Sequence, residues 1–346
     1  MATLLRLTDH GLYCEAGDFH VDPWGAVPRA VVTHAHGDHV AWGCGSYLTT
    51  TSGLPPLRAR LDRDARIRAL AYGEAIVING VRVSLHPAGH ILGSAQVRME
   101  YQGEVWVVSG DYKIDPDPTC AAFEPVRCHT FVTESTFGLP IYRWPPQQEV
   151  FAEINAWWRA NQRAGKATLL FAYALGKAQR LLAGLDPSLG PIFTHGAVER
   201  MTQAYLAAGV QLPLTTHAAT VERGADWSQA LVLAPPSADG SPWTRRFGNQ
   251  ATGFASGWML VRGARRRGAL DRGFALSDHV DWPGLMAAID ATGASRIWVT
   301  HGYSSVVVRW LRERGLEAHL VQTRFEGERD DEERDADAAV ASPEYP

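Results

Sequence analysis

Short apolar runs rich in β-branched residues recur along the first part of the chain and predict buried strands. Clear examples lie at residues 30–33, 83–85 and 105–109. Asn79-Gly80, between two segments of alternating apolar residues, is typical of a tight β-hairpin. Residues 1–138 are therefore expected to be rich in strands, with a helix of undefined length after His39.

From about Pro145 the apolar positions change to a helical spacing that alternates with short strands. Residues 147–163 place Val150, Ile154 and Trp157 on one face of an expected helix, and a strand is expected at 168–171. Further helices are expected at 176–185, 198–208 and 304–314, and further strands at 191–194, 230–234 and 297–301. This alternation predicts a small α/β domain after the strand-rich part.

A string of metal-binding residue types, H-x-H-x-D-H, follows the run at 30–33. On an extended segment His34 and His36 can point the same way and bind one cation, while Asp38 and His39 can reach a second one. Three later apolar runs lead to a further histidine or aspartate: His90, Asp111 and His301. Since strands that end in such residues converge on one sheet edge, the sequence predicts a site for two divalent cations. Such ligands suit Zn²⁺, and Mn²⁺ also fits them.

The order of these residues resembles the metallo-β-lactamase superfamily, whose site uses H-x-H-x-D-H, a histidine, a bridging aspartate and a last histidine. The resemblance implies an α/β fold with the αββα sandwich of that superfamily. It also implies two ligand groups that share Asp111 as a bridge: His34, His36 and His90 for one cation, and Asp38, His39 and His301 for the other. Asp22 matches the first motif of the superfamily and would orient a ligand without touching a cation.

Four later segments resemble the β-CASP domain, which nucleic-acid-processing members insert between the bridging aspartate and the last histidine. They are Thr133–Gly138 with its acid Glu134 (motif A), Phe171–Arg180, Leu276–His279 (motif B) and Thr300–Tyr303 (motif C). The resemblance implies four regions: a metallo-β-lactamase domain at 1–138 and 274–325, an inserted α/β β-CASP domain at 139–273, and an acidic tail at 326–346.

Within this family, the segments 256–259 and 277–282 and the arginines between them look most similar to the bacterial ligase-associated DNA damage response exonucleases. This likeness implies a DNA exonuclease in DNA repair that works with an ATP-dependent DNA ligase and a helicase. A histidine at motif C, as in His301, is instead the pattern of the RNA-processing branch. An endo- or exoribonuclease is therefore the alternative.

The chemistry that the resemblance implies is phosphodiester hydrolysis. Two cations, bridged by Asp111 and held in part by Asp38, would acidify a shared water into hydroxide near neutral pH and stabilise the charge that develops on the phosphate. His279 lies outside the ligand set and would protonate the leaving oxygen. Glu134 would hydrogen-bond to His279 and fix its ring.

Basic residues of the inserted segment are candidates for nucleic-acid contacts. Four arginines close to Trp258 suit phosphates and stacked bases: Arg262, Arg265, Arg266 and Arg267. Lys177 and Arg180 follow Gly176 near an expected helix start, where backbone N–H groups favour anions. A solvated surface turn and ordinary helix capping are the respective alternatives.

The formal net charge of −4 is unevenly distributed. Residues 326–346 contain nine acids and two arginines, a net of −7, which leaves +3 on residues 1–325. A tail of this composition is expected to be disordered. No 18-residue apolar run and no signal peptide is evident, so a cytoplasmic protein without membrane contact is expected. The four cysteines show no C-x-x-C spacing, which argues against a zinc ribbon or a disulfide framework.

Two other classes of protein share part of this pattern. A small-molecule hydrolase of the lactamase or thioesterase type has the H-x-H-x-D-H string, but it needs neither an inserted basic domain nor the Glu134–His279 pair. A scaffold subunit without activity would have lost ligands, whereas every ligand of the pattern is present here. The sequence therefore favours a metal-dependent nuclease.

Overall fold

The computed structural model describes residues 3–261 and 270–323, and these form two compact units. The first unit comprises Met1–Arg143 and the described residues from His279 onward, and the second comprises Trp144–Asp278. The inserted segment therefore begins and ends slightly later than the predicted range of 139–273. The tail at 326–346 lies outside the described residues.

Local packing explains both boundaries. Tyr142 belongs to the first unit because its ring meets that of Phe137, with ring centroids 4.9 Å apart, and its carbonyl accepts a hydrogen bond from Trp282 N. Leu276 belongs to the second unit because it is part of that unit's apolar core. Tyr142 and Leu276 each lie in a loop after a strand, where the pattern of apolar residues does not mark a domain boundary.

The first unit contains two sheets that pack face to face. The six-stranded sheet has the order β1 (Leu5–Thr8), β2 (Gly11–Cys14), β3 (Phe19–Val21), β4 (Ala30–Val31), β5 (Tyr47–Thr50), β6 (Ile67–Leu70). The seven-stranded sheet has the order β19 (Glu317–Leu320), β18 (Arg296–Thr300), β11 (Thr130–Glu134), β10 (Glu104–Val108), β9 (Ala95–Tyr101), β8 (Val81–Pro87), β7 (Ala75–Ile78). Val31 and Leu48 of one sheet share a buried core with Val97 and Val132 of the other.

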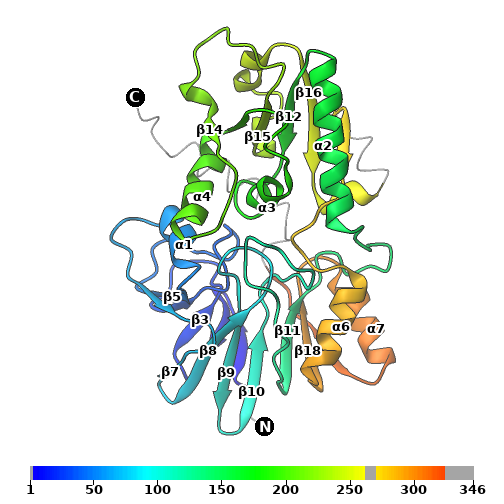
Figure 1. The fold of residues 1–346 in the computed structure, drawn as a ribbon. Helices are drawn as coiled ribbons and strands as arrows, with labels where there is room; N and C mark the ends of the chain where they lie inside the picture. Colours follow the sequence, from blue (N-terminus) through cyan, green and yellow to red (C-terminus); the bar gives the residue numbers. More distant parts are fainter. Residues whose placement is uncertain (1–2, 262–269, 324–346) are drawn as a thin grey trace. The chain divides into compact units, whose positions relative to one another are not determined.

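On the other face of the seven-stranded sheet, α6 (Trp282–Thr292) and α7 (Ser304–Glu313) lie beside β11 and β18 (Figure 1). Neighbouring residues of β11 alternate between the two cores: Val132 faces the first sheet, and Phe131 packs with the helices. This unit also contains the short helix α1 (Leu54–Arg60). The helix expected after His39 does not form, since residues 40–46 make turns that lead into β5.

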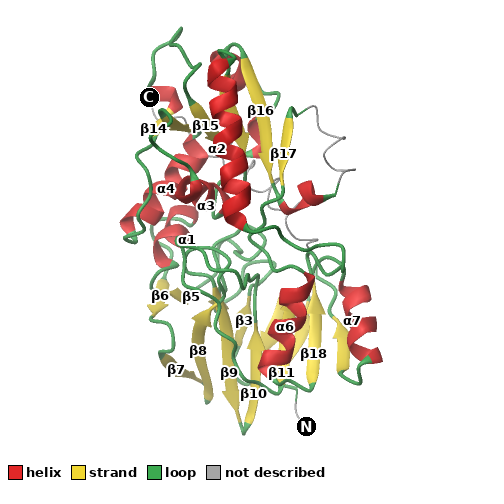
Figure 2. Ribbon diagram, turned by 45° about the vertical axis from the view of Figure 1, so that its right-hand side comes forward, coloured by secondary structure: helices red, strands yellow, loops and turns green. Residues whose placement is uncertain are grey.

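The second unit is built on six parallel strands in the order β14 (Thr216–His217), β13 (Ile192–Thr194), β15 (Leu231–Ala234), β12 (Ala167–Phe171), β16 (Gln250–Ala255), β17 (Arg272–Phe274). The α-helices in the described residues of this unit are α2 (Gln147–Arg163), α3 (Lys177–Gly184) and α4 (Gly196–Ala207). Figure 2 shows α2 lying along the sheet beside β16. Val150, Ile154 and Trp157 of α2 are buried, in agreement with the helical spacing. The prediction of an α/β fold with an inserted α/β part is confirmed.

The carboxyl ends of several strands lie at the same end of the seven-stranded sheet. β10, β11 and β18 are parallel neighbours. Asp111 follows β10 after two residues, and Ser135 and His301 directly follow β11 and β18. β8 runs in the same direction because it is antiparallel to β9, which is antiparallel to β10. The segment after β8 carries His90. This arrangement places residues that are far apart in sequence at one edge.

Candidate metal centre

The loop after β4 carries four of the predicted ligands, all of them buried: His34, His36, Asp38 and His39. Asp22, after β3, fixes the start of this loop, because its Oδ1 accepts a hydrogen bond from Thr33 N (2.8 Å) and its Oδ2 one from Thr33 Oγ1 (2.6 Å). The same Oδ2 lies 2.7 Å from His39 Nδ1. A carboxylate only accepts, so His39 carries its proton on Nδ1 and turns Nε2 towards the other ligands.

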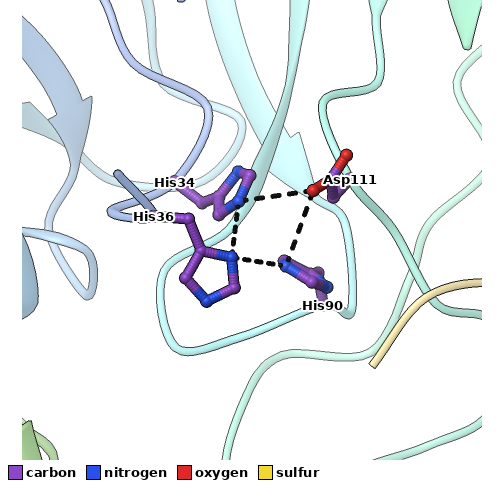
Figure 3. Close-up of side chains that lie close together, drawn as sticks. All are labelled: His34, His36, His90 and Asp111. Atoms are coloured by element: carbon purple, nitrogen blue, oxygen red, sulfur yellow. Dashed lines mark hydrogen bonds and ion pairs between the residues drawn. The ribbon is translucent and has the colours of Figure 1, made fainter. Parts of the chain in front are cut away.

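A first group of ligand atoms is formed by His34, His36, His90 and Asp111, and these atoms all lie within 4.8 Å of one another (Figure 3). Nε2 of His34 and Nε2 of His90 each lie 3.1 Å from Nδ1 of His36. Asp111 Oδ2 lies 3.7 Å from His34 Nε2 and 3.9 Å from His90 Nε2. Burial, and then the neighbouring histidines, hold the pKa of His34 well below its usual value. Imidazoles that converge in this way fit a cation such as Zn²⁺.

A second group is formed by Asp38, His39 and Asp111. His39 Nε2 lies 3.4 Å from Asp38 Oδ2 and 3.4 Å from Asp111 Oδ2. Burial alone would lower the pKa of His39, but the carboxylates of Asp38, Asp111 and Asp22 outweigh burial and hold it well above its usual value. This part of the centre therefore has a surplus of negative charge, which a second cation fits.

Asp111 belongs to both groups. Burial opposes its ionisation, but His39, His279 and His90 outweigh burial and lower the pKa of this carboxyl. The preceding Gly110 has φ 57°, and a Cβ there would lie 2.6 Å from the Thr33 side chain. Only glycine fits at this position, because the turn that delivers Asp111 is both left-handed and in close contact with the histidine loop.

His301 lies near the second group without joining it. Among residues 3–261 and 270–323, the sets of ligand atoms within 4.8 Å of one another do not include His301. Its ring centroid is 5.7 Å from that of His39, and it lines a cavity of about 40 Å³ together with Asp22, Asp38 and His39. His301 is therefore placed beside the second group, and its role as a ligand stays a prediction.

The two predicted catalytic partners are in direct contact. His279 Nδ1 lies 2.8 Å from Glu134 Oε2, and Glu134 Oε1 accepts a hydrogen bond from the backbone N of Tyr112 (2.8 Å). Asp111, Glu134 and His279 form a third group of atoms within 4.8 Å of one another. The sequence did not indicate Tyr112, because its contribution comes from a backbone N–H.

The predicted nucleic-acid contacts have a different outcome. Lys177 and Arg180 are buried and face a carboxylate: Lys177 Nζ lies 3.7 Å from Asp278 Oδ2, and Arg180 Nε lies 3.0 Å from Asp278 Oδ1. Both side chains therefore contact Asp278, whereas the sequence predicted that they contact phosphate. The sequence shows a positive charge near a helix start, but it does not show which carboxylate is buried beside it. Trp258 is half-buried in the 3-10 helix Gly257–Leu260. Arg262, Arg265, Arg266 and Arg267 lie outside the described residues.

Comparison with known proteins finds relatives similar to about half of the chain or more. The chain is 32% identical over 317 residues to a probable DNA ligase of Opitutus terrae, covering 90% of this chain and 30% of that protein. It is 27% identical over 186 residues to Endoribonuclease YSH1 of Yarrowia lipolytica, covering 49% of this chain and 22% of that protein. It is 30% identical over 186 residues to Cleavage and polyadenylation specificity factor 73 of Drosophila melanogaster, covering 49% and 27%. The chain thus spans less than a third of the length of these relatives.

No protein-family model matches the chain. Among solved structures, a protein of unknown function from Enterococcus faecalis V583 is similar in fold, with a TM-score of 0.52 and 11% identity over 78% of this chain and 74% of that one. Within residues 3–261 and 270–323, no helix combines the length and the apolar character needed to cross a membrane.

Proposed function

We infer that this chain, which belongs to the metallo-β-lactamase β-CASP family, hydrolyses phosphodiester bonds of nucleic acid. One observation carries the proposal: the carboxylate of Asp111 belongs to two groups of potential cation ligands and also lies beside the Glu134–His279 pair. A small-molecule hydrolase needs no such pair. Two cation positions next to a histidine that can transfer a proton suit phosphodiester hydrolysis.

The residues present fit two divalent cations. His34, His36 and His90 would hold one cation, Asp38, His39 and His301 the other, and Asp111 would contact both. Zn²⁺ suits this mixture of imidazole and carboxylate, and Mn²⁺ is the second candidate. When bound, the cations would supply an acidified water as nucleophile and neutralise the charge on the phosphate.

The chain's own residues supply the proton transfer. Nδ1 of His279 is engaged by Glu134, so Nε2 is the nitrogen that we assign to protonating the leaving oxygen. Glu134 is itself fixed by the Tyr112 N–H, and therefore holds the ring in one orientation. Asp22 has the corresponding role for His39, because it keeps the proton on Nδ1.

We further propose that the substrate is DNA and that the reaction is exonucleolytic, in DNA repair. The relative that matches 90% of the chain is named as a probable DNA ligase, which supports action beside a ligase and, as the family resemblance implies, a helicase. RNA is the second candidate, since relatives that match 49% of the chain are named as an endoribonuclease and as a cleavage and polyadenylation factor.

The deciding experiment uses single-stranded DNA and RNA of one sequence, labelled at the 5′ or the 3′ end, with Zn²⁺ or Mn²⁺ added to metal-free protein. Stepwise shortening of DNA from one end is expected, with RNA cleaved much more slowly. Asp111→Asn serves as the control for contaminating nucleases. Internal cuts in RNA would favour the ribonuclease, and the absence of cleavage in every arm would refute the proposal.

A separate measurement tests the arginines at 265–267 as phosphate contacts. Replacing Arg265, Arg266 and Arg267 with Ala should weaken binding of single-stranded DNA and flatten its salt dependence by roughly 0.7 in slope per lost contact. Arg309→Ala is the control, because Arg309 is exposed on α7 and paired with Glu313. If the salt dependence of DNA binding has the same slope in the triple variant and in the unmodified chain, these arginines do not contact phosphate.

A further inference from the structure

The turn that carries His301 has an unusual backbone. His301 and Gly302 follow β18 with φ values of 53° and 63°, so two consecutive residues are left-handed. A residue with a Cβ adopts this conformation only where its surroundings hold it there. The contacts of this turn therefore determine the position of the His301 imidazole relative to the sheet.

Those contacts come from the end of the neighbouring strand. β11 and β18 are parallel, with Glu134 opposite Thr300, and the buried Ser135 follows directly after Glu134. The hydroxyl of Ser135 donates a hydrogen bond to the carbonyl oxygen of His301. The carbonyl of Ser135 accepts one from the backbone N of Tyr303 (3.0 Å). Ser135 thus binds the turn on both sides of Gly302.

A second hydroxyl strengthens this anchor. Ser304 Oγ, at the start of α7, donates to the same carbonyl of His301 at 2.8 Å and lies 3.2 Å from Ser135 Oγ. The two segments are also in close contact, since a Cβ on Gly302 would lie 2.4 Å from the Ser135 carbonyl oxygen. The turn cannot shift towards β11, and the hydroxyl groups prevent it from moving away.

We propose that Ser135 is a positioning residue that aims His301 at Asp38 and His39 and so sets the affinity of the second cation. The inference rests on the proposed function in one respect, that His301 is a ligand of that cation. Adjacent residues at the end of one strand then serve two histidines: Glu134 orients His279, and Ser135 orients His301.

The test is cation binding, measured by competition between metal-free protein and a chelator of known affinity. Ser135→Ala should bind the first Zn²⁺ as the unmodified chain does and the second about 10- to 100-fold more weakly, the usual cost of removing an outer partner of a metal ligand. Thr292→Val is the matched control, because Thr292 is equally buried and its hydroxyl donates to the Ile289 carbonyl at the end of α6. His301→Ala, measured in parallel, should lose the second cation altogether.

The outcomes separate the inference from its premise. If His301→Ala loses the second cation while Ser135→Ala binds both with unchanged affinity, the positioning role is refuted and the proposed site stands. If His301→Ala keeps both cations, the ligand role of His301 is wrong and the inference falls with it. Should Ser135→Ala fail to fold, Ser304→Ala decides by the same criterion, since it removes the other hydroxyl from the same carbonyl.

Discussion

Replacing His279 with Ala tests the proton transfer on which the proposed mechanism depends. His279 lies in contact with Glu134 Oε2 at 2.8 Å, and its Nδ1 is 3.9 Å from Asp111 Oδ2. The variant loses the proposed proton donor and keeps all seven proposed cation ligands. Cleavage of ordinary phosphodiesters should therefore fall by ~100- to 10,000-fold, the usual contribution of general acid catalysis.

The magnitude for Glu134→Gln follows from the same contacts. Gln keeps an acceptor for the Tyr112 N–H and removes the charge opposite His279. A hydrogen bond to a charged group contributes about 1.5–3 kcal/mol, so the expected loss is roughly 10- to 100-fold. The double variant should be no slower than His279→Ala alone, because Glu134 acts through His279.

Two substrates make the assay specific. The rate on DNA is compared with the rate on a p-nitrophenyl phosphodiester, whose leaving group departs without a proton, and cation content is measured in each variant. His279→Ala should affect DNA much more than the p-nitrophenyl ester, with both cations retained. His86→Ala is the control, because His86 lies on β8 outside the three groups of potential cation ligands, and its Nε2 is 3.0 Å from Ser84 Oγ. Equal damage to both substrates, or loss of a cation, would refute the assignment.

Two further outcomes are expected. Asp111→Ala should lose both cations together, since its carboxylate belongs to both groups, and about two ions still bound per chain by elemental analysis would contradict this. Burial, and then His217, lower the pKa of His195 to about 4 from its usual 6.5. The unfolded chain therefore binds more protons between these values, and stability should fall as pH drops from about 6.5 to 4. His195→Asn keeps an acceptor at the start of α4 for Ala197 N and should flatten the dependence of melting temperature on pH; an unchanged slope would contradict the stated cause.

The histidine string indicated the local part of the centre, and the family resemblance added the distant residues His90, Asp111, Glu134 and His279. The spacing of His34 and His36 indicated a group of side chains that could hold a cation, because residues two apart on an extended segment share a face. The sequence did not indicate that Ser135 contacts His301, which is 166 residues away. It also did not indicate that Tyr112 holds Glu134, because the contact uses a backbone N–H, a group that every residue other than proline has. The contacts of Asp278 with Lys177 and Arg180 could not be predicted either. Basic side chains near a helix start do not indicate which carboxylate the tertiary structure places beside them.

The strand order of the first unit also determines when the centre can form during synthesis. β18 lies next to β11, yet the whole second unit is made between them. At roughly 5–20 residues per second, an emerging chain carries His34, His36, His90 and Asp111 on the order of ten seconds before it carries His279 and His301. Under the proposed mechanism, a ribosome-bound chain has neither the proton donor nor the last histidine. Under that mechanism, a partly synthesised chain would cleave the nucleic acid around it far more slowly than the finished chain.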